Sequence, residues 1–411
     1  MTARVSPSSG SAGGGSPLTL TVVLCLAEVL GMAGTMTVPA LLPVFIQDWS
    51  LSATEAGWLS GAAHLGYVLA VPVLLGLTDR LDNRRIYLWS TALTALSCAG
   101  FALAGDAFVP ALLFRALGGV GLAGTYMPGL RILSDHIQGP RAGRCMSFYT
   151  ASYGIGVAGS TLIAGLAAGA GDWRLAFWLA AAGTAAAWLL ALLLVPPTAP
   201  HADEAPKGWA ALFDFRPVLR NRPAMGYILA YAAHCWELFG CRGWLVAFLA
   251  FAAGAPAGQV PAHVTTLATA VLLLGVVSSI LGNEAAARWG RDRFLTVIML
   301  ASAAVAALFG FLGDAPFALV AAVALVYGLL ITADSASLTV GMVGAAGAGR
   351  RGAAMAMHSL FGFGAAFLAP IAFGAVLEVG GGASDTTGWG LAFASLGVVV
   401  ALGPLLLRVM R

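Results

Sequence analysis

The chain has 411 residues, of which 59% are hydrophobic and only 9% are charged. Because a soluble globular domain carries roughly 25% charged residues, this composition excludes an ordinary soluble protein and indicates a lipid-facing surface. The net charge of +3 comes from basic residues dispersed among loops, so no nucleic-acid partner is expected. The five cysteines include no C-x-x-C pair, and the sequence predicts no disulfide framework, metal site or cofactor.

The first 17 residues are rich in Gly, Ser and Pro and are predicted to form a disordered tail. The apolar run that follows, 18–46, is too long for a cleavable signal peptide and carries Glu28 at its middle. Further runs, each about the 20 residues that span a bilayer as a helix, occur at 55–77, 86–105, 107–132, 145–170, 173–195, 223–252, 262–284, 294–313, 316–341, 352–377 and 388–407. The sequence predicts an all-α membrane protein with about twelve transmembrane helices.

A polar stretch, 196–222, separates two sets of six runs. We therefore expect four parts in the chain: the disordered tail 1–17, an N-terminal six-helix bundle 18–195, a cytoplasmic linker 196–222 and a C-terminal six-helix bundle 223–411.

Basic residues are concentrated in alternate loops. The loops on one side hold Arg80, Arg84, Arg85, Arg141, Arg144, Lys207, Arg216, Arg220, Arg222, Arg288, Arg291, Arg293, Arg350 and Arg351. The loops on the other side hold Asp48, Glu55, Asp106, Asp172, Asp314, Glu378 and Asp385, with Arg174 as the one basic residue. Since basic loops stay in the cytoplasm, we expect a multi-pass protein of the bacterial plasma (inner) membrane with both termini cytoplasmic.

The turn after the second run is charged and includes Asp79, Arg80, Arg84 and Arg85. It resembles the loop after the second helix of the major facilitator superfamily, which reads roughly Gly-x-Leu-Ala-Asp-Arg-x-Gly-Arg-Arg. The first glycine falls one residue late, at Gly76, and Asp82 and Asn83 stand at the later Gly and Arg positions. The resemblance implies that this turn closes the cytoplasmic ends of the bundles as a gate.

A second copy of this turn follows another apolar run and indicates an internal repeat. One common offset carries Arg80 and Arg85 onto Arg288 and Arg293, and also carries Tyr153-Gly154 onto Phe361-Gly362. Two halves in the same orientation are the parallel repeat of this superfamily, whose fold is two six-helix bundles that alternate access to a central site. Ala287 stands where the first copy has Asp79, so the two halves are not functionally equal.

Ionisable side chains within membrane spans are expensive and usually functional. Arg115 begins the stretch Arg-Ala-Leu-Gly-Gly-Val-Gly, which resembles the fourth-helix motif of the superfamily. In relatives that arginine is associated with proton coupling or an anionic substrate; the structural alternative is that it bonds neighbouring helices or carbonyls. The resemblance also places the first helix at the central cavity, which would bring Glu28 within reach of Arg115. A permanently buried ion pair is the structural alternative there.

The seventh helix carries His234, Glu237 and Arg242, and Glu237 maps near Glu28 by almost the repeat offset. We assign these three residues, with Glu28 and Arg115, to proton coupling or the substrate cavity. His234, Glu237 and Cys241 share a helix face, but one helix does not complete a metal site, so no metal is expected.

Three further buried groups have two interpretations each. Asp334 is either a relay or a structural partner of Arg288 or Arg291 at the cytoplasmic end of the tenth helix. His64 and His358 could relay protons, but packing histidines are the more common case.

The predicted function is secondary active transport of a small organic solute by alternating access, coupled to protons. Arginine does not release its proton, so the titrating group should be a carboxylate, and no P-loop for ATP occurs. Leu30-Gly31 with Pro39 to Pro43 resembles the first helix of proton-driven drug or metabolite efflux antiporters, although Ser160 follows Gly159 where such exporters carry a Gly-Pro signature.

A non-transporting receptor or scaffold would need a soluble domain, and an enzyme would need a nucleophile–base motif. The expected partners are a small-molecule substrate, protons and membrane lipid, and the chain is expected to be monomeric.

Overall fold

The computed structural model describes residues 17–78, 80–137, 139–198, 215–347 and 350–411. Within these residues, 12 helical segments are long and apolar enough to cross a membrane. The all-α class and the number of spans predicted from the sequence are thereby confirmed. The tail, most of the linker and Asp79 lie outside the described residues.

The helices follow the chain as two sets. The first set consists of α1 (Pro17–Gly31), η1 (Met32–Gly34), α2 (Thr37–Trp49), α3 (Ala53–Thr78), α4 (Asn83–Ala104), α5 (Phe108–Ala123), α6 (Tyr126–His136), η2 (Gly139–Arg141), α7 (Ala142–Gly169) and α8 (Trp173–Leu194). The second set consists of α10 (Arg216–Leu219), α11 (Arg222–Ala252), α12 (Ala262–Trp289), α13 (Arg291–Phe309), η3 (Gly310–Leu312), α14 (Phe317–Ala333), α15 (Ser335–Ala345), α16 (Arg351–Val379), α17 (Thr386–Ala401) and α18 (Gly403–Val409).

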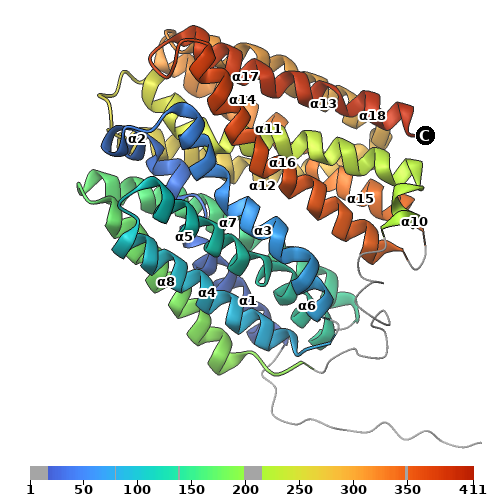
Figure 1. The fold of residues 1–411 in the computed structure, drawn as a ribbon. Helices are drawn as coiled ribbons and strands as arrows, with labels where there is room; N and C mark the ends of the chain where they lie inside the picture. The colour runs from blue at the N-terminus through green and yellow to red at the C-terminus, as the bar shows by residue number, and fades with distance from the viewer. Residues whose placement is uncertain (1–16, 79, 138, 199–214, 348–349) are drawn as a thin grey trace, which may run out of the picture.

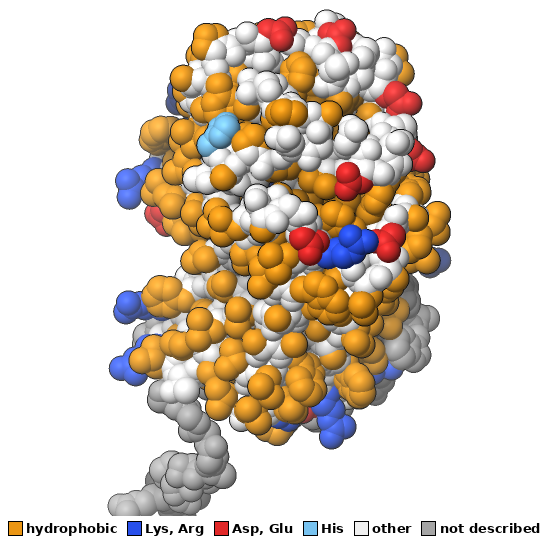
Figure 2. Space-filling view, turned by 90° about the vertical axis from the view of Figure 1, so that its left-hand side faces the viewer, with side chains coloured by type: hydrophobic (Ala, Val, Ile, Leu, Met, Phe, Trp, Pro, Cys, Tyr) orange, Lys and Arg blue, Asp and Glu red, His pale blue; other side chains and the backbone are white. Residues whose placement is uncertain are grey.

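The two sets form two bundles that lie side by side, blue to green below and yellow to red above in Figure 1. The end that carries α6, α10 and α18 holds the arginine-rich turns, and we call it the basic end. We call the opposite end, with the turns after α2, α4 and α7, the acidic end. Figure 2 looks onto the acidic end, where Asp and Glu side chains are scattered among hydrophobic ones.

Four spans are interrupted rather than continuous. The first breaks at η1, the fourth between α5 and α6, the tenth between α14 and α15, and the twelfth between α17 and α18. Proline explains three of these breaks, because its missing N–H leaves the carbonyl four residues earlier without a helical partner. Pro39, Pro128 and Pro404 each follow a break by a few residues, whereas the tenth span breaks at Asp334.

The bundles join along α3 and α16, along α7 and α12, and along α2 and α11. At the acidic end, Oε2 of Glu378 accepts hydrogen bonds from the N–H and Oγ1 of Thr54 at 3.2 and 2.7 Å. At mid-membrane the rings of Tyr67 and Phe363 are 4.0 Å apart. Between described residues, the hydrogen bonds and ring contacts across the two bundles all lie between the acidic end and mid-membrane. The acidic end is therefore the closed end of the molecule.

Candidate functional site

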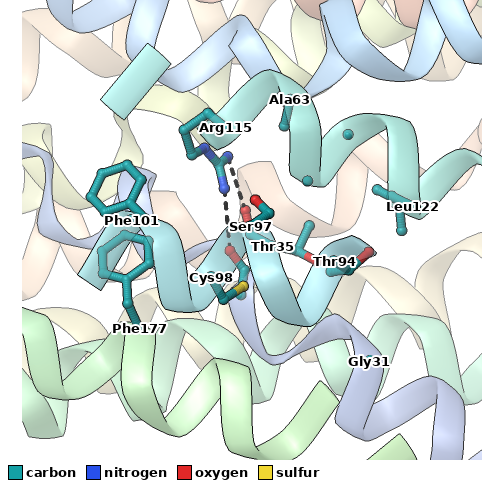
Figure 3. A pocket seen from close by; sticks show the side chains of 13 residues that line it. Gly31, Thr35, Ala63, Thr94, Ser97, Cys98, Phe101, Arg115, Leu122 and Phe177 are labelled. Carbon is teal, nitrogen blue, oxygen red and sulfur yellow. Dashed lines mark hydrogen bonds between the residues drawn. The ribbon is translucent and has the colours of Figure 1, made fainter. Parts of the chain in front are cut away.

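Arg115 lies on α5 and points at the break in the first span (Figure 3). Its Nη1 donates to the carbonyl of Gly34 at 3.2 Å, and its Nη2 donates to the carbonyl of Thr35 at 3.3 Å. Pro39 cannot donate the backbone N–H that would normally reach Thr35, so the guanidinium satisfies a carbonyl that the sequence leaves free. The same residues line a cavity of about 40 Å³, enough for about one water molecule.

Glu28 lies on α1 and is 1% exposed. Its Oε2 accepts a hydrogen bond of 2.8 Å from the hydroxyl of Tyr149 on α7, and its Oε1 has no partner among the described atoms. Glu28 and Arg115 form no ion pair among the described contacts: Arg115 donates to the backbone carbonyls of the first span, and Glu28 accepts from Tyr149. Whether Glu28 carries a proton stays a prediction.

His64 occupies the middle of the bundle interface. Its ring lies 4.5 Å from the ring of Phe239 and 6.1 Å from that of Phe363, centroid to centroid. Arg242 lies 5.8 Å over the same Phe239 ring that His64 contacts, and Arg115 lines its cavity together with Ala63, the residue next to His64. One comes from each bundle, so the interface carries two positive charges around one aromatic cluster.

Arg242, on α11, is only partly buried and lies 5.8 Å over the ring of Phe239. It lines a cavity of about 20 Å³ together with Tyr327 and Thr332. Among the described side chains, neither Arg115 nor Arg242 forms an ion pair with a carboxylate. A charge at this depth in a membrane normally finds a counter-charge, and none of the described carboxylates supplies one to either arginine.

Glu237 is the second buried acid on the candidate site and is 1% exposed. Its Oε1 accepts hydrogen bonds from Ser302 Oγ at 2.8 Å and from Tyr327 Oη at 3.1 Å, and its Oε2 has no partner among the described atoms. As expected from the helix geometry, it does not pair with Arg242, which is five residues further along α11.

Asp334 lies against His234 and does not form the expected pair with Arg288 or Arg291. Its Oδ1 lies 2.7 Å from Nδ1 of His234, with both side chains almost fully buried, although the ring N–H is not aligned for a straight hydrogen bond. Arg291 donates instead to the carbonyl of Ser337 at 2.7 Å. Asp334 sits in the break of the tenth span, one turn deeper than that contact, which explains the difference.

His358, on α16, lies near the same pair. Its Nε2 is 3.2 Å from Thr339 Oγ1, and its ring stacks on Tyr231 at 3.7 Å. Tyr231 also stacks on His234 at 5.6 Å, so one tyrosine ring contacts both imidazoles.

The residues assigned to the cytoplasmic gate lie at the basic end. Arg84 donates to the carbonyl of Leu192 at 2.6 Å, a contact within the N-terminal bundle, and Asp82 caps α4 by accepting from the Arg84 N–H. Arg85, Arg288 and Arg293 are exposed. Asp79 lies outside the described residues. The role of Asp79, Arg80 and the other assigned residues as a gate therefore stays a prediction.

The sequence interpretation missed the hydroxyl groups that contact the buried acids. Tyr149, Tyr327 and Ser302 supply these contacts from helices distant in sequence. Ser160 was also missed: its Oγ donates to the carbonyl of Ala33 at 2.7 Å and accepts from the N–H of Met36 at 3.0 Å, bridging the break in the first span. In the sequence, only Pro39 indicates this break, because its missing N–H leaves the carbonyl of Thr35 without a partner in its own helix.

Two bundles of six spans, with buried charges at their interface, define a multi-pass membrane transporter rather than an enzyme. The family model described as Major Facilitator Superfamily matches residues 24–261, more than half of the chain. The chain belongs to the Major Facilitator Superfamily.

Curated relatives and solved structures agree with this membership. The chain is 32% identical over 194 residues to the 3-(3-hydroxy-phenyl)propionate transporter of Escherichia coli (strain K12), which is 46% of this chain and 44% of that protein. It is 24% identical over 159 residues to the niacin transporter NiaP of Acinetobacter baylyi, 39% of this chain and 36% of that protein. These matches therefore span less than half of the relatives' length.

Two solved structures share the fold over nearly the whole chain. The nucleoside transporter NupG gives a TM-score of 0.75 at 18% identity, covering 95% of this chain and 98% of that chain. A bacterial homologue of the human lysosomal transporter Spinster, in an inward-facing and unoccupied conformation, gives 0.73 at 16% identity, covering 97% and 96%.

Proposed function

We propose that the chain is a secondary active transporter that moves a small organic anion by alternating access, coupled to protons. The observation that carries this proposal is the pair Arg115 and Arg242, one from each bundle, each lining a cavity and neither paired with a carboxylate among the described residues. Because an unpaired guanidinium is costly inside a membrane, an anionic substrate is the counter-charge that fits.

A small aromatic carboxylate is the substrate class we favour. Niacin and 3-(3-hydroxyphenyl)propionate, the compounds named for the two relatives, both combine one carboxylic acid with one aromatic ring. A planar guanidinium group can donate two parallel hydrogen bonds to a carboxylate. The rings of His64, Phe239 and Phe363 offer aromatic contacts beside it.

Proton coupling follows from the charge of such a substrate. Moving one negative charge into a cell whose interior is negative costs about 2.3 kcal/mol per 100 mV. Co-transport of one proton removes this electrical cost and adds the pH gradient as a driving force. The buried acids Glu28, Glu237 and Asp334 are the groups able to take up that proton, since arginine does not titrate.

We infer that the basic end faces the cytoplasm of the bacterial plasma membrane and that the chain works as a monomer. With this orientation, the contacts between α3 and α16 close the periplasmic side. The described state is then one that receives or releases substrate on the cytoplasmic side, and the gate at Asp79 would close in the opposite state.

Binding to purified, reconstituted protein tests the substrate class. Nicotinate and 3-(3-hydroxyphenyl)propionate are compared with nicotinamide and 3-phenylpropanol, which keep the ring and lack the charge. We expect the acids to bind and the uncharged compounds not to bind. Arg242→Gln should weaken acid binding about tenfold or more, as expected for a lost charge-assisted contact, while Arg220→Gln at the exposed basic end should not. Equal binding of acids and uncharged analogues would contradict the anion proposal.

Efflux by proton antiport is the second candidate, favoured by the glycine–proline break in the first span. Vesicles of known orientation discriminate the two: symport accumulates the acid on the side to which protons flow, and antiport on the opposite side. A receptor or scaffold would bind the acid without moving it in either preparation.

A further inference from the structure

The C-terminal bundle buries more ionisable groups than an anion site at Arg242 requires. His234, Glu237, Asp334 and His358 come from α11, the α14–α15 break and α16, and each is at most 3% exposed. We call these four residues the C-terminal polar cluster. The described N-terminal bundle has no comparable group of acids and histidines around Glu28, whose hydrogen-bond partner is Tyr149.

The members of the cluster lie close to one another. His234 and Asp334 approach to 2.7 Å, and Glu237 follows His234 by three residues on the same face of α11. The ring of Tyr231 stacks on both His234 and His358. Two carboxylates and one adjacent imidazole therefore share one dry region, where two negative charges without compensation are unfavourable.

Other titratable groups around the cluster are phenols, thiols and one arginine. α11 contributes Tyr231, Cys235, Cys241 and Arg242, and α14 contributes Tyr327. From α13 comes the hydroxyl of Ser302, and the sequence of α17 contains no titratable side chain. Since thiols and phenols are neutral at ordinary pH, the carboxylates and histidines decide how many protons the cluster holds.

The partners of Glu237 suit a group that changes its protonation state. A hydroxyl can donate to a carboxylate and can also accept from a carboxylic acid, whereas an arginine only donates. Glu237 has two hydroxyl partners and one oxygen, Oε2, without a partner among the described atoms. It can therefore gain or lose a proton while its neighbours remain satisfied.

We propose that the C-terminal polar cluster binds the transported proton, which Glu237 exchanges with the His234–Asp334 pair. The cluster carries one more negative charge when Glu237 is ionised than when it is protonated. The inference rests on the proposed function in one respect, namely that the bound proton is the one transported.

Tyr327 connects this proton site to the anion site. Its hydroxyl donates to Glu237, and the same residue lines the cavity beside Arg242. An anion bound at Arg242 would bring a negative charge beside Tyr327 and hence toward Glu237, which disfavours ionised Glu237, so anion binding and protonation of Glu237 support each other. By reciprocity the proton also tightens anion binding, which is the coupling that symport needs.

Infrared difference spectroscopy of the reconstituted full chain across pH tests proton binding without any substrate. A buried carboxylic acid gives a C=O stretching band that disappears as the acid ionises. We expect one titrating band that is lost in Glu237→Gln and retained in Glu28→Gln. Tyr327→Phe, a milder change that does not depend on Glu237→Gln folding, should shift the band frequency by removing one hydrogen bond. A band lost in Glu28→Gln, unmoved by Tyr327→Phe, or absent altogether overturns the inference.

Transport measurements separate this inference from the proposed function. In proteoliposomes, Glu237→Gln should keep nicotinate counterflow while losing accumulation driven by a pH gradient. Accumulation retained in Glu237→Gln overturns the coupling role even where the infrared band is lost. If wild-type protein moves neither nicotinate nor 3-(3-hydroxyphenyl)propionate, the proposed substrate class fails, and the infrared result alone still decides whether the cluster binds a proton.

Discussion

At the scale of single residues, hydroxyl groups and backbone carbonyls replace the ion pairs that the buried charges suggested. Glu28 and Glu237 are contacted by tyrosine and serine hydroxyls. Arg115 is contacted by two carbonyls of a broken helix. Each arrangement satisfies a charged group without binding it to a permanent counter-ion.

Ser160 bridges the break in the first span. Ser160→Ala removes a hydroxyl that accepts from the buried N–H of Met36 and donates to the carbonyl of Ala33. The carbonyl keeps a second donor, Thr37 Oγ1 at 3.3 Å, but the N–H loses its partner, which costs about 1–3 kcal/mol. We therefore expect a lower unfolding temperature for purified Ser160→Ala and weaker acid binding, because the carbonyls that position Arg115 lie in the same break.

Ser147→Ala is the matched control, since the Ser147 hydroxyl bonds only its own helix and is exposed. Its unfolding temperature should equal that of the wild type. Equal stability of both variants would show that the break is held by packing alone.

At the scale of elements, glycine permits the close contact of α3 with α16. A Cβ built on Gly57 would lie 2.3 Å from the carbonyl oxygen of Pro370, and one on Gly374 would lie 2.1 Å from that of Ala53. Small residues allow such approach between membrane helices. Because these glycines sit near the acidic end, they set how tightly that end can close.

Gly57→Ala should favour the state in which the acidic end is open. The added methyl group cannot fit against Pro370 unless α3 and α16 separate. Pulsed EPR between spin labels at Asp48 and Asp314, exposed positions on the two bundles, should show a larger fraction of long distances than in the parent.

Gly159→Ala provides the comparison, because a Cβ there meets nothing within 4 Å. It should leave the distance distribution unchanged. A distribution in Gly57→Ala that matches the parent would mean that the bundles can absorb the methyl group without opening.

At the scale of the whole molecule, the two bundles meet at one end, and their loops differ in charge from end to end. The orientation in the membrane rests on this charge asymmetry. We predict that reporter fusions placed after Asp106 and after Arg144 lie on opposite sides, with the first in the periplasm. Reporters on the same side of the membrane would contradict the twelve-span topology of the proposal.

The class of protein, the number of spans and the position of ionisable residues within the spans could all be predicted from the sequence. These properties are local: a run of about 20 apolar residues spans the bilayer whatever its neighbours are, and a charged residue within that run is buried by its position. The internal repeat indicated two bundles for the same reason, since each half carries its own pattern of runs and turns.

Which buried groups contact one another could be seen only in the three-dimensional structure. Asp334 lies against His234 rather than beside Arg288 or Arg291, and Arg115 reaches carbonyls rather than Glu28. Such contacts depend on how each helix is rotated and where it breaks, and a hydrophobic run does not encode its rotation when lipid and protein interior are equally apolar. The packing of small residues and the unpaired carbonyls near prolines set these rotations, and they act between helices far apart in sequence.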